Sequence, residues 1–485
     1  MDTEVLIPLR ETRHREPALV EPVIRRLPEN LNPLRALGAV ESAAHTVYFE
    51  SGGEEGDHAR WTILAFDPLY RLEVRAGTLW RTEGGSTTAV PGEPLRALAQ
   101  AWPERLAMPD EAPVPFMSGF AGYLAYDLKD QIERYPQRAK RESVCADLSL
   151  GFYDVVWAWD RKTGRGWAVS SGLPEPDPRR REERARARLA EQWARIVDGG
   201  SPPRESSAPA GPPVSNFTRD EYLRAVERAL ERIAAGDIYQ VNLSQRLLVE
   251  RAPDPAVLFR RLRRESPAPF SAFLSYPGGG IASSSPERFF RVQGDRIETW
   301  PIKGTRPRGA TPEEDAALKE ALRSSAKDRA ENVMIVDLER NDLGRICDIG
   351  TVAVPALWDV ASYANVHHLV SRVEGRLRSD VHPVDVIRAL SPGGSITGAP
   401  KIRAVEIIDE LEPTRRGIYT GALGYWDVRG GCDWNIAIRT IVVESGTASF
   451  HVGGGIVADS TPEGEYEETL VKASAMLRAL SGPST

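Results

Sequence analysis

The sequence predicts an α+β protein with mostly antiparallel sheets. Short strand-like runs such as HTVYFES, WTILAF and YDVVWAWD, separated by Gly, Pro and Asp turns, fill the first 172 residues. Further strand-like runs follow between clusters of helical pattern, without the regular strand–helix alternation that builds a parallel sheet. With 485 residues, the chain is long enough for two domains.

Composition argues against several classes of protein. Apolar residues make up 41% and charged residues 27%, which is enough for a sizeable core, and the net charge of -7 is opposite in sign to that of most nucleic-acid binders. The three cysteines, Cys145, Cys347 and Cys432, are too scattered for a disulfide framework. No run of about 18 apolar residues and no apolar signal-peptide core occurs. We expect a soluble cytoplasmic protein with no nucleic-acid or membrane partner.

Changes in composition divide the chain into three parts. The strand-rich residues 1–172 are expected to form an N-terminal domain, and residues 216–480 a second domain. Residues 173–215 between them are expected to hold a short helix and a flexible linker.

Helical spacing of apolar residues predicts the connecting helix, at Leu189, Trp193, Ile196 and Val197. The residues after it, 199–213, are rich in Pro, Gly and Ser and predict a flexible linker. An arginine run at 179–188 could bind nucleic acid, but the interleaved Glu182 and Glu183 favour a solvated helix face.

The second domain begins with a clear helix start. Its signals are a capping box, a hydrophobic staple and a glycine stop, formed by Thr218 with Glu221, Phe217 with Tyr222, and Gly236. The strand-like runs IYQVNLSQRLLVE, FSAFLSY, GIASSSPERFFRV and RIETWPIKG follow. A second capping box, Thr311 with Glu314, predicts the start of another helix.

One lysine stands out in the stretch PIKGTRPRG. Lys303 lies between a proline-initiated extended run and a Gly-Thr turn, shortly before Arg306 and Arg308. Spacing alone favours a solvated charge at a strand end. A reacting amine would need a depressed pKa, because a free lysine is only about one part in a thousand neutral near pH 7.4. Burial or the neighbouring cations would have to provide that shift.

Two glutamates have contrasting surroundings in the sequence. Glu331 lies four and seven residues before Ile335 and Leu338, so it should share the helix face that turns toward the core, where a carboxylate needs a cation. Glu468 lies four residues before Lys472, and spacing alone favours an exposed ion pair contributing roughly 0.3–0.5 kcal/mol.

Other polar residues stand in apolar or Gly-rich settings. Arg439 in IAIRT sits in an apolar strand and needs a partner, and VGGGIVADS can present consecutive backbone N–H groups at a sharp turn. Glu287 follows SSSP at a strand end, where a solvated charge is the default. His367 and His368 are adjacent, so in a strand they face opposite sides and cannot chelate one metal together.

The long motifs of the second half resemble one enzyme family. In order, GDIYQVNLSQ, SSSPERF, PIKGTRPRG, ENVMIVDLERNDLGRIC, SPGGSITGAPK and GGGIVADSTPEGEYEETLVKA resemble the chorismate-utilising enzymes, which include anthranilate, aminodeoxychorismate and isochorismate synthases. The resemblance spans Phe217 to about Ala479 and implies a two-lobed chorismate-binding fold. Through VYFESG and PFMSGFAGYLAYDL, the first domain resembles the N-terminal half of the two aminating members only.

The resemblance implies roles for individual residues. Glu331 and Glu468 match the family's two magnesium-binding glutamates, and Mg²⁺ is the implied cofactor. Glu287 matches the acid that protonates the departing C4 hydroxyl of chorismate, a role that needs a raised pKa. His368 matches an active-site histidine, whereas His367 is expected to be structural. The implied substrate contacts are Gln240, Ser395, Thr397, Tyr425, Arg439, Gly454, Gly455 and Lys472.

Two positions separate the reactions of the family. Isochorismate-forming members resemble this chain but have a lysine at the position of Gln240, and that lysine activates water. The side chain of Gln240 cannot act as such a base, so the resemblance disfavours hydration of chorismate. Anthranilate synthases have alanine where this chain has Lys303, and aminodeoxychorismate synthases have lysine there. The resemblance thus implies a covalent lysine route to amination at C4. Anthranilate formation is the alternative within the family, and an inactive metabolite-binding regulatory protein on the same fold is the alternative outside it.

The resemblance also implies partners. No cysteine lies in a glutaminase-like context, so ammonia is expected from a separate glutamine amidotransferase subunit, and a separate lyase is expected to eliminate pyruvate. The family also suggests a tryptophan pocket, formed by Ser51, His58, Arg60, Trp61, Pro269, Phe270 and Ser271.

Overall fold

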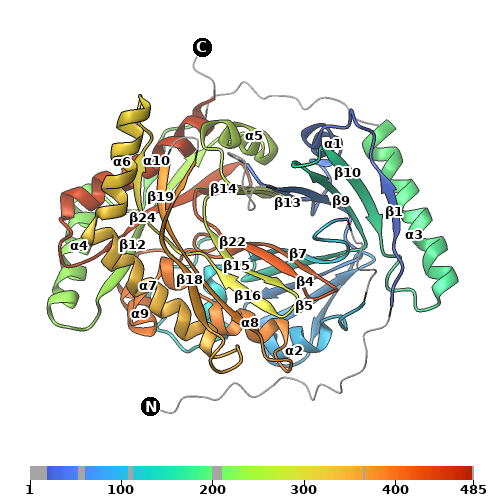
Figure 1. Ribbon diagram of the computed structural model, residues 1–485, viewed down its shortest axis with the longest axis horizontal. Helices are drawn as coiled ribbons and strands as arrows, with labels where there is room; N and C mark the ends of the chain where they lie inside the picture. Colours follow the sequence, from blue (N-terminus) through green and yellow to red (C-terminus); the bar gives the residue numbers. More distant parts are fainter. Residues whose placement is uncertain (1–18, 53–59, 108–112, 199–209, 364–365, 483–485) are drawn as a thin grey trace.

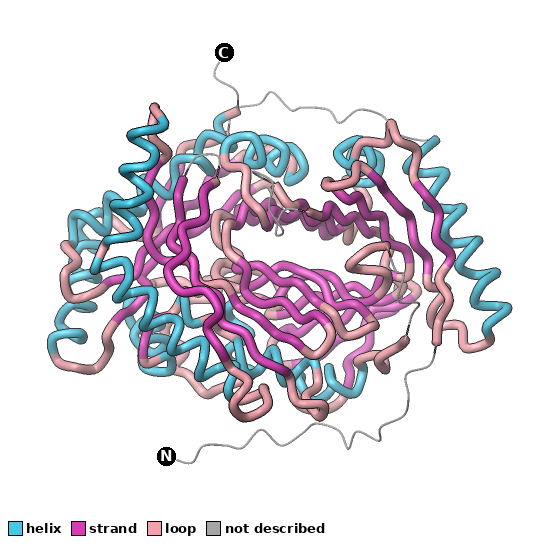
Figure 2. The backbone as a smooth tube through the Cα atoms, viewed as in Figure 1, coloured by secondary structure: helices cyan, strands magenta, loops and turns pink. Residues whose placement is uncertain are grey.

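Two large antiparallel sheets face each other in the computed structural model, with helices outside them (Figures 1 and 2). The structure describes residues 19–52, 60–107, 113–198, 210–363 and 366–482. Each sheet has 12 strands, and every pair of neighbouring named strands is antiparallel. The α+β fold with antiparallel sheets is therefore confirmed. No described helix is both long enough and apolar enough to cross a membrane.

The first sheet combines strands from the N-terminal and C-terminal halves of the chain. Its strand order is β1 (Val23–Arg26), β10 (Arg165–Ser170), β9 (Val155–Asp160), β3 (Trp61–Ala65), β2 (Val47–Glu50), β13 (Phe270–Tyr276), β14 (Gly279–Ser285), β23 (Thr440–Glu444), β24 (Thr447–Ile456), β12 (Gln240–Glu250) and β11 (Pro213–Ser215). The short β20 (Gly398–Ala399) also pairs with β12. The longest register is β12 against β24, from Val241 opposite Ile456 to Glu250 opposite Thr447.

The second sheet also combines strands from the N-terminal and C-terminal halves of the chain. Its order is β17 (Ile302–Pro307), β19 (Val366–Arg376), β16 (Arg296–Thr299), β15 (Arg288–Gln293), β22 (Cys432–Ile436), β21 (Ala422–Asp427), β7 (Gly119–Leu124), β8 (Leu148–Tyr153), β4 (Tyr70–Arg75), β5 (Thr78–Glu83) and β6 (Ser86–Val90), with β18 (Ala353–Ser362) paired to β19. Because β2 pairs with β13 and β7 with β21, the expected domains 1–172 and 216–480 do not form separate sheets.

Helices close the apolar faces that the sheets leave open. The first sheet is covered by α4 (Arg219–Ala234), α5 (Pro255–Glu265), α9 (Lys401–Leu411) and α10 (Pro462–Ser481). Near the second sheet lie α2 (Pro94–Ala101), α6 (Pro312–Ser324), α7 (Ala326–Gly344) and α8 (Pro383–Leu390), while α1 (Pro33–Val40) lies near the β1 edge of the first. Buried aromatic side chains pack on the sheets, among them Phe116, Phe120 and Trp434. Apolar burial of this kind is the main favourable term in folding.

The helix starts of the second half follow the sequence closely. The reciprocal capping box of Thr218 and Glu221 is formed, the rings of Phe217 and Tyr222 lie 5.6 Å apart, and Gly236 follows the helix at φ +79°. At α6 only half of the expected box forms. The Thr311 hydroxyl accepts from the N–H of Glu314, but the Glu314 carboxylate accepts from the N–H of Ala310 instead.

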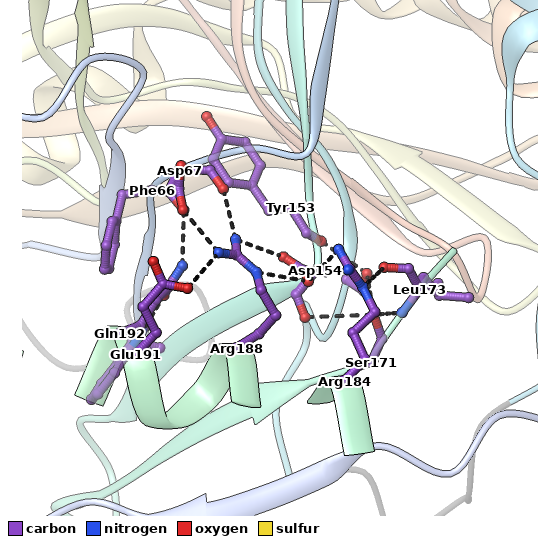
Figure 3. Close-up of polar contacts among 12 residues, drawn as sticks. Phe66, Asp67, Tyr153, Asp154, Ser171, Leu173, Arg184, Arg188, Glu191 and Gln192 are labelled. Carbon is purple, nitrogen blue, oxygen red and sulfur yellow. Dashed lines mark hydrogen bonds and ion pairs between the residues drawn. The ribbon is translucent and has the colours of Figure 1, made fainter. Parts of the chain in front are cut away.

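The connecting segment forms a helix that is partly tied to the sheets. The helix α3 (Pro178–Trp193) ends in a π-helical turn, Ala194–Asp198, and buries Leu189 and Ile196 as predicted. The arginine run is not simply a solvated face, because Arg188 donates to both Asp154 and Asp67 (Figure 3). Of the predicted linker, residues 199–209 lie outside the described residues, and residues 213–215 form strand β11.

We predict that Arg188→Ala lowers the free energy of unfolding by roughly 3 kcal/mol, because it leaves the carboxylate of Asp154, only 1% exposed, without its main cation. Urea denaturation followed by circular dichroism measures this change. Arg186→Ala on the same helix is the control, because its pair with Glu182 is exposed and should contribute less than about 0.5 kcal/mol. Equal effects of the two substitutions would contradict the prediction.

Candidate active site

The structure places Lys303 at an irregularity in strand β17. The pairing of β17 with β19 shifts register between Lys303 and Thr305, and Gly304 adopts φ +78°. The expected Gly-Thr turn is therefore a β-bulge, a feature that redirects side chains out of the regular pleat. Through it, the Lys303 ammonium reaches the backbone oxygen of Ser395 at 3.3 Å.

The surroundings of Lys303 lower its pKa. Burial is the largest cause, while the carboxylates of Glu331 and Glu287 act in the opposite direction. Lys472 is the cation that contributes to the lowering. The expected role of Arg306 and Arg308 is wrong, because their guanidinium groups are bound to Asp328 and Asp315.

Glu287 lies in the short link between β14 and β15 and is buried. Its side chain is 5% exposed, so the default expectation of a solvated charge is wrong. Burial raises the pKa of its carboxyl to about 7, against the opposing effects of a hydrogen bond from the Ser395 side chain and the charge of Lys303. A carboxyl with this pKa holds a proton for a substantial part of the time at neutral pH, as a general acid must.

The two adjacent histidines point to different partners, as expected for neighbours in a strand. His367 contacts Asp315 through Nε2 at 2.9 Å and Ser362 through Nδ1 at 2.8 Å. His368 contacts the hydroxyl of Thr305 through Nδ1 at 2.9 Å, and its buried Nε2 has no partner among the described residues. Burial lowers the pKa of His368 to about 3, so this imidazole is neutral at pH 7. It can donate or accept one hydrogen bond from a bound molecule.

A short turn between α8 and β20 links these groups. The 3₁₀ turn Gly394–Ile396 carries Ser395, whose backbone oxygen also accepts from the amide of Asn242 at 3.2 Å. The Thr397 hydroxyl donates to the backbone oxygen of Gly393 at 2.9 Å, so it closes the turn. Ser395 thus contacts both Lys303 and Glu287, and Thr397 stabilises the conformation of the turn.

Arg439 lies beside this cluster with its charge unpaired. It joins β22 to β23 in a left-handed conformation, φ +50°, so the expected position within a strand is wrong. No hydrogen bond or ion pair of its guanidinium is found with the described residues, and burial lowers its pKa. The charge of Arg439 also lowers the pKa of His368, which places the two groups near each other. An unpaired guanidinium suits the carboxylate of a ligand.

The Gly-rich segment is part of strand β24 and not the expected sharp turn. Gly454 and Gly455 pair with Leu243 and Asn242 of β12. A Cβ at Gly455 would lie 2.8 Å from the Gln240 amide nitrogen, and one at Gly454 would lie 2.7 Å from a carboxylate oxygen of Glu465. Both positions therefore need glycine for this close packing. The buried side-chain oxygen of Gln240 has no hydrogen-bond partner among the described residues.

The expected metal ligands come from two helices. Glu331 on α7 is half-buried, and Glu468 on α10 is 49% exposed and bound to Lys472 at 2.6 Å. The i,i+4 ion pair indicated by spacing is therefore formed. Within the described part of the chain, no three His, Cys, Asp or Glu side chains gather as a metal-binding group. Mg²⁺ needs fewer, because it commonly takes one or two carboxylates and completes its shell with water and substrate oxygen.

Another carboxylate, more deeply buried, lies close to Glu468 on the same helix. Glu465, one turn before Glu468, is 7% exposed and accepts from the Ser460 hydroxyl through Oε1 at 2.6 Å, while its buried Oε2 has no partner among the described residues. Burial raises the pKa of both Glu465 and Glu331, and the charge of Glu468 raises each of them further, as expected for acids that share a site without a cation. These residues fit Mg²⁺.

A cavity of about 730 Å³ is lined by residues of both sheets. Of the residues expected around tryptophan, it is lined by Ser51, Arg60, Trp61, Pro269, Phe270 and Ser271, and His58 lies outside the described residues. Tyr425 lines the same cavity, with its ring stacked 4.8 Å from that of Phe116. Tyr425, one of the expected substrate contacts, therefore lies at this cavity, and its contact with the substrate stays a prediction.

Known proteins similar to this chain in sequence and fold identify its family. A family described as chorismate binding enzyme matches residues 45–478. The chain belongs to the chorismate binding enzyme family. Aminodeoxychorismate synthase component 1 of Klebsiella aerogenes is 39% identical to this family member over 91% of the chain and 95% of its own length. Anthranilate synthase component 1 of Bacillus caldotenax is 37% identical over 95% of the chain and 93% of its own length.

Larger and solved relatives extend the comparison. The aminodeoxychorismate synthase of Streptomyces griseus is 40% identical, and this chorismate binding enzyme spans 66% of that protein's length. The crystal structure of anthranilate synthase component I from Streptococcus pneumoniae TIGR4 superimposes with a TM-score of 0.77 at 31% identity, covering 88% of this chain and 94% of that one.

Two buried carboxyls of this chorismate binding enzyme were not singled out from the sequence. Glu465 lies three residues before Glu468 on the same helix face, and that spacing is a signal that could have found it. Glu339 lies eight residues after Glu331 and accepts from the backbone N–H of Gly394 at 3.2 Å. Its partner is 55 residues away in the sequence, so no local pattern indicates the contact.

We predict that the Glu287 carboxyl loses its proton with a midpoint near pH 7. Its folded pKa is raised above the ordinary 4.5, so the protonated form persists in the folded protein well above that value and disappears as the pH rises through about 7. Infrared difference spectra recorded between about pH 5.5 and pH 8.5 should show the protonated-carboxyl band. Subtracting the spectra of Glu287→Gln isolates its contribution, and a midpoint below about pH 5 would contradict the prediction.

Proposed function

We propose that the protein is the chorismate-aminating subunit of an aminodeoxychorismate synthase. It would convert chorismate and ammonia into 4-amino-4-deoxychorismate, the precursor of 4-aminobenzoate and folate. The observation that carries this proposal is Lys303, a half-buried amine of lowered pKa held 3.3 Å from the Ser395 carbonyl and beside the protonatable Glu287. The similarity to aminodeoxychorismate synthase component 1 over nearly the whole chain supports it.

The reaction would proceed in two substitutions. The neutral amine of Lys303 attacks C2 of chorismate, the ring double bonds shift, and the C4 hydroxyl leaves as water after taking the proton of Glu287. Ammonia then forms a bond to C4, the double bonds shift back, and the C2–nitrogen bond to Lys303 breaks. Splitting one difficult step into two easier ones is the ordinary benefit of covalent catalysis.

The charges of the substrate would be met by groups whose partners are missing in the structure. Arg439 offers an unpaired guanidinium for one carboxylate. The buried Gln240 oxygen and His368 Nε2 lack partners among the described residues and can complete hydrogen bonds to the ring substituents. Lys472, 45% exposed, is paired with Glu468 at 2.6 Å and would have to exchange this partner for the substrate.

Mg²⁺ would be held by Glu331 and Glu468, with Glu465 close to them. When bound, it supplies positive charge that neutralises a substrate carboxylate and the surrounding acids. The Glu465 oxygen without a partner and the small number of ligands that Mg²⁺ requires support this assignment.

A separate glutamine amidotransferase would deliver the ammonia, in keeping with the name component 1 of the relatives. The cysteines do not supply a glutaminase nucleophile, because Cys347 and Cys432 are buried and burial raises the pKa of Cys145 to about 12. A separate lyase would convert the product to 4-aminobenzoate, and we place the reaction in the cytoplasm.

Anthranilate synthase is the second candidate function. The 37% identity to the Bacillus caldotenax enzyme and the likeness to a solved anthranilate synthase favour it. The two functions differ in the aminobenzoate isomer and in whether pyruvate is released. We prefer amination at C4 because of the placement of Lys303.

Replacing Lys303 should divert or abolish the reaction. We expect Lys303→Ala to lower the rate of C4 amination with ammonium by roughly 10²–10⁴-fold, as for other groups that take part directly in a reaction. Product formation is followed by chromatography with mass detection. Lys319→Ala, which removes an exposed lysine of α6, is the matched control and should keep the wild-type rate. Undiminished amination by Lys303→Ala would rule out the covalent role.

We also propose that the cavity between the sheets binds tryptophan. Its aromatic lining by Phe49, Trp61 and Tyr425 and its polar groups, such as Ser51 and Ser271, suit an aromatic amino acid. Saturating tryptophan should then raise the melting temperature, because a ligand that binds only the folded state stabilises it. Glycine at the same concentration is the control. Unchanged melting temperature and unchanged rate with tryptophan would contradict the proposal.

A further inference from the structure

A buried carboxyl lies directly beneath the turn that contacts Lys303 and Glu287. Glu339, on α7, is 3% exposed and belongs to the buried stripe of that helix with Ile335 and Leu343. Its Oε1 accepts from the backbone N–H of Gly394 at 3.2 Å. Gly394 is packed so closely on α7 that a Cβ there would lie 2.7 Å from Leu338 and 3.1 Å from Glu339.

The turn transmits this contact to the reacting groups. Gly394 begins the 3₁₀ turn, and the next residue is Ser395. The Ser395 backbone oxygen accepts from Lys303, and its side chain is hydrogen-bonded to Glu287. A change in the position of Gly394 therefore moves both the contact of the amine and the contact of the acid.

Glu339 does not form a stabilising ion pair with the charged groups around it. The charged groups that face it are Asp342 on the same helix, Lys401 on α9 and Glu287 ahead of β15. Lys401 donates its hydrogen bond to Asp342 and not to Glu339. A buried carboxyl whose hydrogen bond comes from a backbone amide costs stability relative to an apolar side chain of similar size.

We propose that Glu339 is a positioning residue that fixes Gly394 and thereby sets where Ser395 meets Lys303 and Glu287. The proposal rests on the proposed function only for its kinetic consequences. A neutral Glu339 acts on the turn without placing a second negative charge beside Glu287. This agrees with the pKa of Glu339, which burial, and then the carboxyl of Asp342, raise to about 8.

The kinetic test compares two substitutions in the full chain. Glu339→Leu removes the acceptor for the Gly394 N–H and should lower kcat for amination with ammonium roughly three- to tenfold, the equivalent of one hydrogen bond, with KM for chorismate changed by less than about twofold. Glu339→Gln keeps an acceptor oxygen and should restore most of kcat. Asp337→Leu removes an exposed carboxyl from the same helix and is the control. Wild-type kcat in Glu339→Leu would overturn the proposal.

The stability test does not depend on the reaction. Because the folded pKa lies above the unfolded value of 4.5, Glu339 costs stability progressively as the pH rises from about 4.5 to about 8. The melting temperatures of Glu339→Gln and Glu339→Leu should therefore exceed that of the wild type more at about pH 8.5 than at about pH 5. A variant that loses kcat and melts lower by the same amount at every pH would show a purely structural residue and overturn the proposal. If the wild type did not aminate chorismate but the melting temperatures showed this pH dependence, the proposed function would be refuted and the structural proposal would stand.

Discussion

The antiparallel pairing of β12 with β24 is the contact on which the candidate site most depends. Its register places Asn242 opposite Gly455 and Leu243 opposite Gly454. The missing side chains at these two positions let Gln240 and the carboxylates of α10 approach the strand closely. Because adjacent residues of a strand face opposite sides, Gly454 leaves room for α10 on one face and Gly455 leaves room for Gln240 on the other. The same pairing joins α10 to the rest of the fold, since this helix packs on β24.

Burial of charge is the second constraint, and it gives the site its reactivity. Glu287 is buried and Lys303 half-buried, and this loss of water lowers the pKa of the amine and raises that of the carboxyl. Each change increases the neutral form of its group at neutral pH. A neutral amine next to a protonated acid is the arrangement that a nucleophile and a leaving-group acid require. Unpaired Arg439 leaves positive charge available for an anionic molecule.

Local patterns predicted the parts of the fold that local interactions determine. The capping box at Thr218, its staple and the helix α3 are formed as expected, because each depends on residues within one or two turns. The fold class also followed from the sequence, since it requires only the alternation of strand and turn patterns. The sharing of both sheets by the two halves did not, because strand pairing is a long-range property.

Side-chain direction within the site was the part that the sequence did not predict. The bulge at Lys303 arises from pairing with β19, and the direction of Tyr425 arises from the place of β21 beside β7. Arg439 leaves the strand in a left-handed conformation that its apolar neighbours do not indicate. Glu339 depends on Gly394, 55 residues away. Each of these features is set by contacts between segments that are distant in the sequence.

The most direct test of the account is the identity of the product. The purified protein is incubated with chorismate, Mg²⁺ and ammonium, and the products are separated by chromatography with mass detection. The account predicts 4-amino-4-deoxychorismate, with 4-aminobenzoate and pyruvate appearing only after a lyase is added. Anthranilate with pyruvate, formed by the protein alone, would show that the amine of Lys303 does not direct the reaction to C4 and would contradict the central claim.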